Sequence, residues 1–241
     1  MTNMLGPWRN VRRGVVACAT AVVLLLAVAP RAYAQTEDGA DADASRDWVE
    51  TFAASIRLLI LEHGVRMAAE PKTRRELGGA FWGDYTRSVR WPRQWSDGDG
   101  WKVNYVGHPV HGAAAGWLWL EHAPARQRGT SAYVKSRLQA AAFAGVYSLQ
   151  FEMGPISEAS IGNVGLRPHT VGWTDLVATP VGAFGVMLLE DAADRYVLAW
   201  IDRRTSNRVV RAIARMTLNP GRGMANLSQG RAPWARTAES R

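Results

Sequence analysis

The chain has 241 residues, of which 47% are hydrophobic and 21% are charged, with eleven Trp, one Cys and a net charge of +8. This composition excludes a disordered acidic or low-complexity protein, and the single cysteine excludes a disulfide-stapled miniprotein and a zinc ribbon. The length is near the usual size of one domain with extensions. The sequence indicates the location of the protein better than its chemistry.

The first 34 residues have the three parts of a secretory signal peptide. Three arginines within residues 9–13 give a positive start, residues 14–30 form an apolar run, and residues 32–34 form a small-x-small cleavage site. The run is shorter than the roughly 20 residues of a transmembrane helix, which favours cleavage over an uncleaved anchor. Cys18 lies inside this run, so we expect an exported mature chain that starts at Gln35 and has no thiol.

Charge is distributed unevenly along the rest of the chain. Residues 35–202 contain sixteen Lys and Arg against twenty acids, whereas residues 203–241 contain nine Arg against one acid. In a cytosolic protein such a tail would indicate nucleic-acid binding, but the signal peptide argues against nucleic acid as a partner. We therefore expect a tail that binds anionic membrane lipids or envelope proteins, or one that is a solvated arm.

The elements of the mature chain follow from its apolar spacing. Residues 35–46 contain no large apolar side chain and predict a flexible linker, whereas apolar residues recur every three or four positions from Asp47 to about Ala69 and predict an amphipathic helix. Residues 81–101 predict a short helix followed by an ordered loop. The chain is thus divided into a signal peptide 1–34, a linker 35–46, a helical domain 47–202 and a basic tail 203–241.

Three weakly polar stretches, 103–120, 138–153 and 171–189, are dense in Gly and Ala. Small residues let helices approach closely, which compensates for a helix propensity about 1 kcal/mol lower for each Gly than for Ala. We predict a mainly α fold in which these closely packed helices form either a soluble domain or a body embedded in, re-entrant into or resting on a membrane. Trp residues near the ends of the stretches favour the membrane. Residues 196–201 are the one run with a strand-like pattern.

The densest group of candidate site residues lies in the segment 104–112, which contains His108 and His111. Pro109 suits the first turn of a helix, so the two imidazoles should lie about one turn apart. Such a pair is half of a metal site or an acid/base pair, but the Glu of a zincin motif is missing. We favour histidines that cap the helix and pack under Trp, and we predict no cofactor.

Two carboxylates at the edges of apolar stretches are further candidates. Asp175 opens the third stretch as a first-turn acid, which helix capping explains. Glu152 ends the second stretch, where an acid opposes the helix dipole, so this position favours a chemical role more strongly. The candidate catalytic residues are therefore His108, His111, Glu152 and Asp175. The sequence contains no Gly-x-Ser-x-Gly elbow, phosphate-binding Gly-rich loop or dinucleotide fingerprint.

Several short motifs occur in a characteristic order between residues 95 and 236. They are Trp95-x-Asp97-Gly98-Asp99, Asn104-Tyr105-x-Gly107-His108-Pro109-x-x-Gly112, Glu152 before a Ser-rich segment, Asp175-Leu176-x-x-Thr179-Pro180-x-Gly182, Leu218-Asn219-Pro220-x-Arg222, Ala225-Asn226 and Pro233-Trp234-x-Arg236. This order resembles a family of bacterial envelope proteins with a domain of unknown function. The resemblance implies an envelope-associated helical protein with its tail ordered against the body, and it implies no reaction. Leu189-Glu190-Asp191 departs from the Gly-Glu pair expected there.

Three functions follow from these observations. The first, which we expect, is a non-enzymatic exported envelope protein with a structural or interaction role at a membrane. The second is a membrane-surface enzyme acting on a lipid or other envelope substrate, with His108 or His111 as base and Glu152 and Asp175 as partners. The third is a soluble periplasmic binding module with an aromatic-lined pocket.

Overall fold

The structure is a computed structural model that describes residues 47–69, 71–88, 95–96, 99–123, 130–161 and 172–236. The predicted signal peptide and linker lie outside the described residues. Helices account for most of the described chain, which contains no strand, and the predicted mainly α fold is confirmed.

The described elements are almost entirely α-helices, joined by two π-helical segments named η1 and η2. In chain order they are α2 (Trp48–Ala69), α3 (Pro71–Glu76), α4 (Phe81–Ser88), η1 (Val103–Gly107), α5 (His108–Glu121), α6 (Thr130–Met153), α7 (Glu158–Ile161), α8 (Trp173–Ala192), η2 (Ala193–Leu198), α9 (Ala199–Arg204), α10 (Arg208–Leu218) and α11 (Pro220–Ser228).

The chain folds as two compact units, and the division falls inside helices α2 and α6. The described residues of the first unit lie within Leu59–Gly98 and Leu149–Trp173. Those of the second unit lie within Gln35–Leu58, Asp99–Ser148 and Thr174–Arg241. This division is not collinear with the sequence, and the domain and tail ranges derived from the sequence stay predictions.

In the first unit, polar side chains join the last part of α2 to the segments that follow it. The ring of His63 stacks on Phe151 with 4.6 Å between ring centroids and 6° between planes, and its Nε2 lies 3.3 Å from the carbonyl oxygen of Ile156. Arg66 forms an ion pair with Glu158. Helix α4 packs against the short helix α7.

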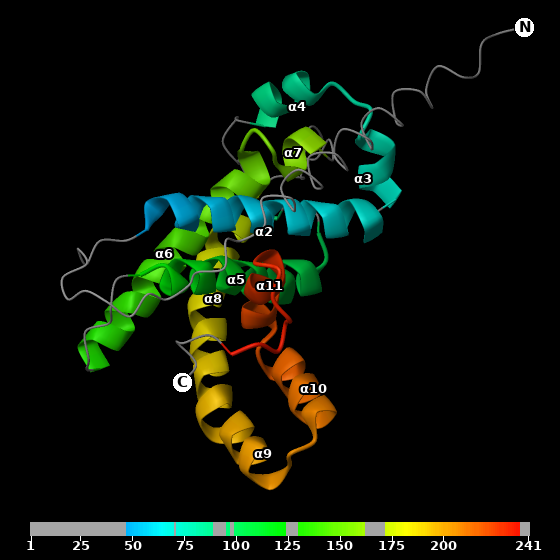
Figure 1. Ribbon diagram of the computed structural model, residues 1–241. Coiled ribbons are helices and arrows are strands. Elements are labelled where there is room, and N and C mark those ends of the chain that lie inside the picture. Colours follow the sequence, from blue (N-terminus) through cyan, green and yellow to red (C-terminus); the bar gives the residue numbers. More distant parts are fainter. Residues whose placement is uncertain are drawn as a thin grey trace, which may run out of the picture. The chain divides into compact units, whose positions relative to one another are not determined.

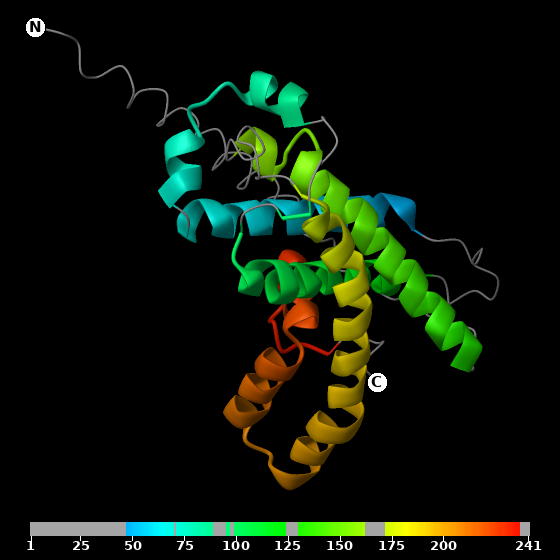
Figure 2. The ribbon, with the colours of Figure 1, turned by 180° about the vertical axis from the view of Figure 1, so that it is seen from behind.

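In the second unit, α5 is the central helix, since most of its residues are buried. Helix α11 packs against α5, and α10 lies beside η2. Helices α8, η2 and α9 follow one another along one arm, and α10 returns along a second arm towards α11; both arms can be followed in the yellow and orange segments of Figure 1 and Figure 2. We call η2, α9 and α10 together the hairpin.

Glycines bring α5 and α8 into close contact. A Cβ atom at Gly112 would lie 2.6 Å from Cγ2 and 2.8 Å from the carbonyl oxygen of Thr179. A Cβ at Gly116 would lie 2.7 Å from the sulfur of Met187, and one at Gly182 would overlap the ring of Pro109. These separations are shorter than van der Waals contact, so the Gly-rich stretches form tightly packed helices, as the sequence predicted.

Helix α2 begins and ends close to the predicted positions, but only part of the predicted apolar stripe is buried. About half of the surface of three stripe residues is exposed: Trp48, Phe52 and Ile56. Ala54 and Leu58 are fully buried instead. Leu59, which belongs to the same predicted stripe, is buried, so the stripe faces the core only in the later part of the helix.

The helix predicted for residues 171–189 is longer than expected, and it continues through η2 and α9 to Arg204. Residues 196–201 are therefore helical, and the strand interpretation was wrong. This helix, Trp173–Arg204, is the one described helix long and apolar enough to cross a membrane by length and composition, a criterion that core helices also meet. It buries Asp175, Thr179 and Glu190, but only 22% of its most apolar window is buried, so most of this apolar surface is exposed.

Candidate functional site

Helices α5 and α8 bring His108 and Asp175 together inside the second unit. His108 is the first residue of α5, directly after η1, and Asp175 lies in the first turn of α8. His108 Nε2 lies 3.3 Å from Asp175 Oδ1, and His108 Nδ1 lies 3.4 Å from Thr179 Oγ1. Asp175 and Thr179 face the same imidazole because residues four positions apart share one face of a helix.

Helix α6 contributes two further side chains to this group. Ser148 donates a hydrogen bond to Thr179 Oγ1 at 3.2 Å. The ring of Tyr147 lies 5.1 Å from the ring of His111, whose centroid is 5.9 Å from that of His108. Three of the four candidate residues, His108, His111 and Asp175, therefore lie in one group of buried side chains.

Glu152, the fourth candidate, belongs to the first unit and lies one residue before the end of α6. Its side chain is buried. Its position at the helix C-terminus is the one that the sequence predicted. A catalytic or metal-ligating role for the four residues stays a prediction.

Asp175, His108 and Thr179 are arranged like a catalytic triad, because a carboxylate and a hydroxyl lie at opposite nitrogens of one imidazole. We call these residues, with Ser148, Tyr147 and His111, the His108 group. All its members are buried, and Thr179 has no exposed surface. In this conformation the imidazole of His108 pairs with both the hydroxyl of Thr179 and the carboxylate of Asp175. The geometry therefore joins α5 to α8, and a substrate would need an opening between these helices to reach the hydroxyl.

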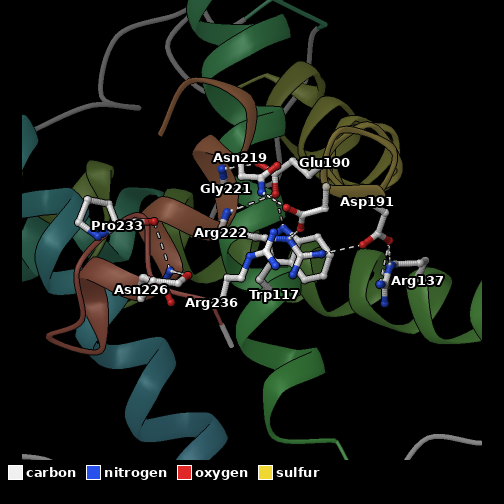
Figure 3. Close-up of polar contacts among 12 residues, drawn as sticks. Trp117, Arg137, Glu190, Asp191, Asn219, Gly221, Arg222, Asn226, Pro233 and Arg236 are labelled. Atoms are coloured by element: carbon white, nitrogen blue, oxygen red, sulfur yellow. Dashed lines mark hydrogen bonds and ion pairs between the residues drawn. The ribbon is translucent and has the colours of Figure 1, made fainter. Parts of the chain in front are cut away.

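A second buried group surrounds Glu190, which lies near the end of α8 and has 1% of its surface exposed. Its carboxylate accepts hydrogen bonds from Trp117 Nε1 at 2.5 Å, from the backbone N–H of Gly221 at 2.6 Å and from that of Arg222 at 3.3 Å (Figure 3). Gly221 and Arg222 are in the first turn of α11, whose N–H groups have no partner within the helix. Glu190 therefore caps α11 from another helix.

Burial raises the pKa of Glu190 to about 7. The hydrogen bonds from Gly221 and Trp117, together with the charge of Arg222, act in the opposite direction and offset only part of this shift. Glu190 thus changes charge near neutral pH, although a solvated glutamate is ionised there.

The indole ring of Trp117 lies beside Glu190 and contacts two guanidinium groups. The guanidinium carbon of Arg222 lies 3.5 Å from the ring centroid and that of Arg137 lies 4.8 Å from it. Both arginines also pair with Asp191, at 2.6 Å and 2.8 Å respectively. This arrangement combines cation–π contacts with ion pairs and connects α5, α6, α8 and α11 (Figure 3).

Acids of the body bind several arginines of the basic tail. Asp202 accepts hydrogen bonds from Arg211, Arg215 and Arg236, and Glu121 pairs with Arg231 through both carboxylate oxygens. Burial acts to raise the pKa of Asp202, but its three arginines outweigh this effect and keep the pKa below its usual value. Much of the basic charge of the tail is therefore neutralised inside the second unit.

Glu190, Trp117 and Arg222 were not among the predicted site residues. The third apolar stretch was predicted to end at Leu189, and Glu190 was identified only as a carboxylate that closes this stretch, without a site role. Its place inside a longer helix could have been found from the apolar pattern that continues to residue 201.

Comparison of the chain with protein-family models, with curated protein sequences and with solved structures found no match.

Proposed function

We propose that the protein is an exported, non-enzymatic protein of the cell envelope that docks on an anionic membrane surface through the hairpin. The single observation that carries this proposal is the outer surface of the hairpin, which combines exposed apolar side chains with exposed arginines. The predicted signal peptide supports the location outside the cytosol.

Helix α10 has two different faces. Arg211 and Arg215 point towards Asp202, whereas Val209 and Ile213 point away from the protein, with 65% and 54% of their surfaces exposed. A short helix with one strongly apolar exposed face is the structural form that binds at the boundary between lipid headgroups and acyl chains.

The first arm of the hairpin carries aromatic side chains of the same kind. Tyr196 and Trp200 are exposed. The guanidinium carbon of Arg195 lies 5.5 Å from the ring of Tyr196, and that of Arg204 lies 5.6 Å from the ring of Trp200. Tyr and Trp are enriched at membrane interfaces, and arginines beside them can reach the headgroup level.

Three arginines lie where the hairpin turns from α9 to α10. Arg203, Arg204 and Arg208 are exposed, and no acid among the described residues forms an ion pair with them. Each such basic residue near an anionic membrane surface contributes about 1 kcal/mol of binding free energy. The combination of this charge with the apolar face favours a lipid surface over a protein partner.

Vesicle co-sedimentation of the mature chain tests the proposal. We expect binding to vesicles that contain anionic phospholipid, and at least tenfold weaker binding for Val209→Asp combined with Ile213→Asp, because charge on the apolar face opposes insertion. Val65→Asp, at an exposed valine of α2, is the matched control. Equal binding of the wild-type and doubly substituted chains would exclude the hairpin as the docking surface.

Export is tested separately by fractionation and N-terminal sequencing. We expect a chain that begins at Gln35 in the periplasmic or envelope fraction, and release from membranes by carbonate, since the proposal is surface docking. An intact N-terminus on protein recovered from the cytoplasm would contradict the proposed location.

An enzymatic role is a second candidate, and the order Asp175, His108, Thr179 favours it. If the imidazole acts chemically, His108→Ala should reproduce the phenotype of a gene deletion while the protein accumulates normally. Loss of the protein itself would instead show that His108 is structural.

A further inference from the structure

Helix α8 has a row of exposed residues that its neighbours α5 and α6 leave uncovered. Val177, Val181, Gly185 and Leu189 follow one another at intervals of four residues, so they lie along one face of the helix. Val181 and Leu189 have 68% and 70% of their surfaces exposed, and a Cβ atom at Gly185 would meet nothing within 4 Å. The row therefore has large side chains on both sides of an open depression at Gly185.

Helix α6 has a row of the same kind. It consists of Val134, Leu138, Ala142 and Val146, again four residues apart, and 54% of the surface of Leu138 and 63% of that of Val146 are exposed. The third of the four residues is again small. An open groove runs along the first part of this row, and its lining includes Val134, Leu138 and Ala142.

The two rows belong to one face of the second unit, which we call the α6–α8 face. Helices α6 and α8 meet where a Cβ atom at Gly145 would lie 3.5 Å from Cβ of Pro180 (Figure 2). Helix α5 covers the opposite side of both helices, since it contacts α8 at Thr179 and α6 at Tyr147. The rows are therefore turned away from α5, on the outside of the unit.

The size of the α6–α8 face matches what a stable homodimer needs. Such an interface buries about 800 Å² on each copy, of which about 65%, or roughly 500 Å², is apolar. Burying one Val or Leu side chain completely removes about 60–120 Å² of apolar surface from water. The six large side chains of the two rows are between 39% and 70% exposed, and the half-buried Phe184 and Leu188 lie beside them on α8. Together these side chains offer on the order of 500 Å² of apolar surface.

The distribution of charge favours a second copy of the chain over lipid. Residues 176–189 contain no charged residue, and Lys135 is the one exposed charged residue among the described residues 130–148. A face that binds anionic lipid combines apolar side chains with several cations, as the hairpin does. The charge-free part of α8 rises only about 21 Å, which is less than the roughly 30 Å of a bilayer core. Across a two-fold axis the same surface meets itself, so a face without charge meets no like-charge repulsion.

We propose that two copies of this chain form a two-fold dimer through the α6–α8 face. Residues at intervals of four form ridges that pack into the grooves of an identical helix, with the two helices crossing at about 50°. The depression at Gly185 receives a large side chain from the row of the other copy. This proposal does not depend on membrane docking, because the dimer leaves the hairpin exposed.

Sedimentation velocity of the full mature chain, without detergent, tests the proposal. A standard interface has a dissociation constant of about 1 µM or tighter, so we expect a dimer at micromolar concentrations. Val181→Asp combined with Leu189→Asp should weaken association about 100-fold, because like charges then meet across the axis. The hairpin variant, Val209→Asp combined with Ile213→Asp, is the matched control and should stay dimeric, which separates this result from the vesicle experiment.

Gly185→Leu is a second variant, chosen because the folded chain has open space at this position. It fills the depression and should weaken association at least tenfold, with circular dichroism as the check on folding. It keeps the test decisive if the double aspartate variant does not fold. Three results would overturn the proposal: a monomer at all concentrations, a dimer that the substitutions on α8 leave unchanged, or a monomer that binds dodecyl maltoside micelles through this face.

Discussion

The indole N–H of Trp117 and the carboxylate of Glu190 form a buried hydrogen bond of 2.5 Å between α5 and α8. The same carboxylate accepts from the first turn of α11. One side chain thus joins three helices that are far apart in the sequence. The ordered position of the C-terminal region depends on an acid more than thirty residues before it.

The pH dependence of stability should carry the signature of Glu190. Its pKa is about 7 in the folded chain against 4.5 for the ordinary group. Between these pH values the folded chain therefore binds more protons than the unfolded chain. The contribution of protonated Glu190 to the free energy of unfolding, about 3 kcal/mol, is fully present below about pH 4.5 and is lost as the pH rises through 7. Urea unfolding between about pH 4.5 and about pH 8 measures it.

Glu190→Gln is the matched variant for this measurement, since the amide has nearly the same shape and does not titrate. We expect the difference in unfolding free energy between the wild-type and variant chains to change by about 3 kcal/mol over this pH range. Parallel curves for the two chains would show that Glu190 has an ordinary pKa.

Gly112→Ala should destabilise the second unit by about 1–3 kcal/mol, because the added methyl group would overlap both the side chain and the backbone of Thr179. Gly185→Ala is the control, since a Cβ atom there meets nothing within 4 Å. Helix propensity should make that variant more stable by up to about 1 kcal/mol. Thermal unfolding that ranks the two variants in the opposite order would contradict the close approach of α5 and α8.

Thr179→Val should lower the free energy of unfolding by about 1–2 kcal/mol. The valine has a similar shape but removes the hydroxyl that contacts Ser148 and His108. Val177→Thr, at an exposed position of the same helix, should change stability by less than about 0.5 kcal/mol. Equal effects in chemical denaturation would mean that the buried polar group does not stabilise the contact of α5 with α8.

The arginines at the hairpin turn should control vesicle affinity and its dependence on salt. Replacing Arg203, Arg204 and Arg208 together by Gln should weaken binding to anionic vesicles about 100-fold, from about 1 kcal/mol for each residue. Raising the ionic strength from about 0.1 M to about 1 M shortens the Debye length from about 10 Å to about 3 Å and should weaken wild-type binding more than variant binding. An identical salt response in both chains would exclude headgroup contacts by these residues.

The predicted helices follow from local patterns and largely match the structure. The apolar spacing after Asp47 gave α2, and the small residues of the stretches 103–120 and 138–153 gave α5 and most of α6. Pro109 marked the start of α5 closely. These features depend on neighbours within a few residues, which is the range over which helix propensity and capping act.

The partners of the buried polar groups depend on positions far apart in the chain. The sequence placed His108 and Asp175 at helix starts, but only the packing of α5 on α8 brings the imidazole to the carboxylate. It also counted nine tail arginines, of which five pair with acids of the second unit. Ion pairing is a property of three-dimensional proximity, and net charge along the chain does not report it.

The sequence by itself determined that this protein is helical and that its helices are built for close approach, whereas export stays a prediction. Only the tertiary structure decided that Glu190 caps α11, which tail arginines remain exposed, and that α6 and α8 share an exposed apolar face. The physical reason is range: helix formation is set by contacts within one or two turns, whereas desolvation and charge pairing are set by whichever distant residues packing brings together.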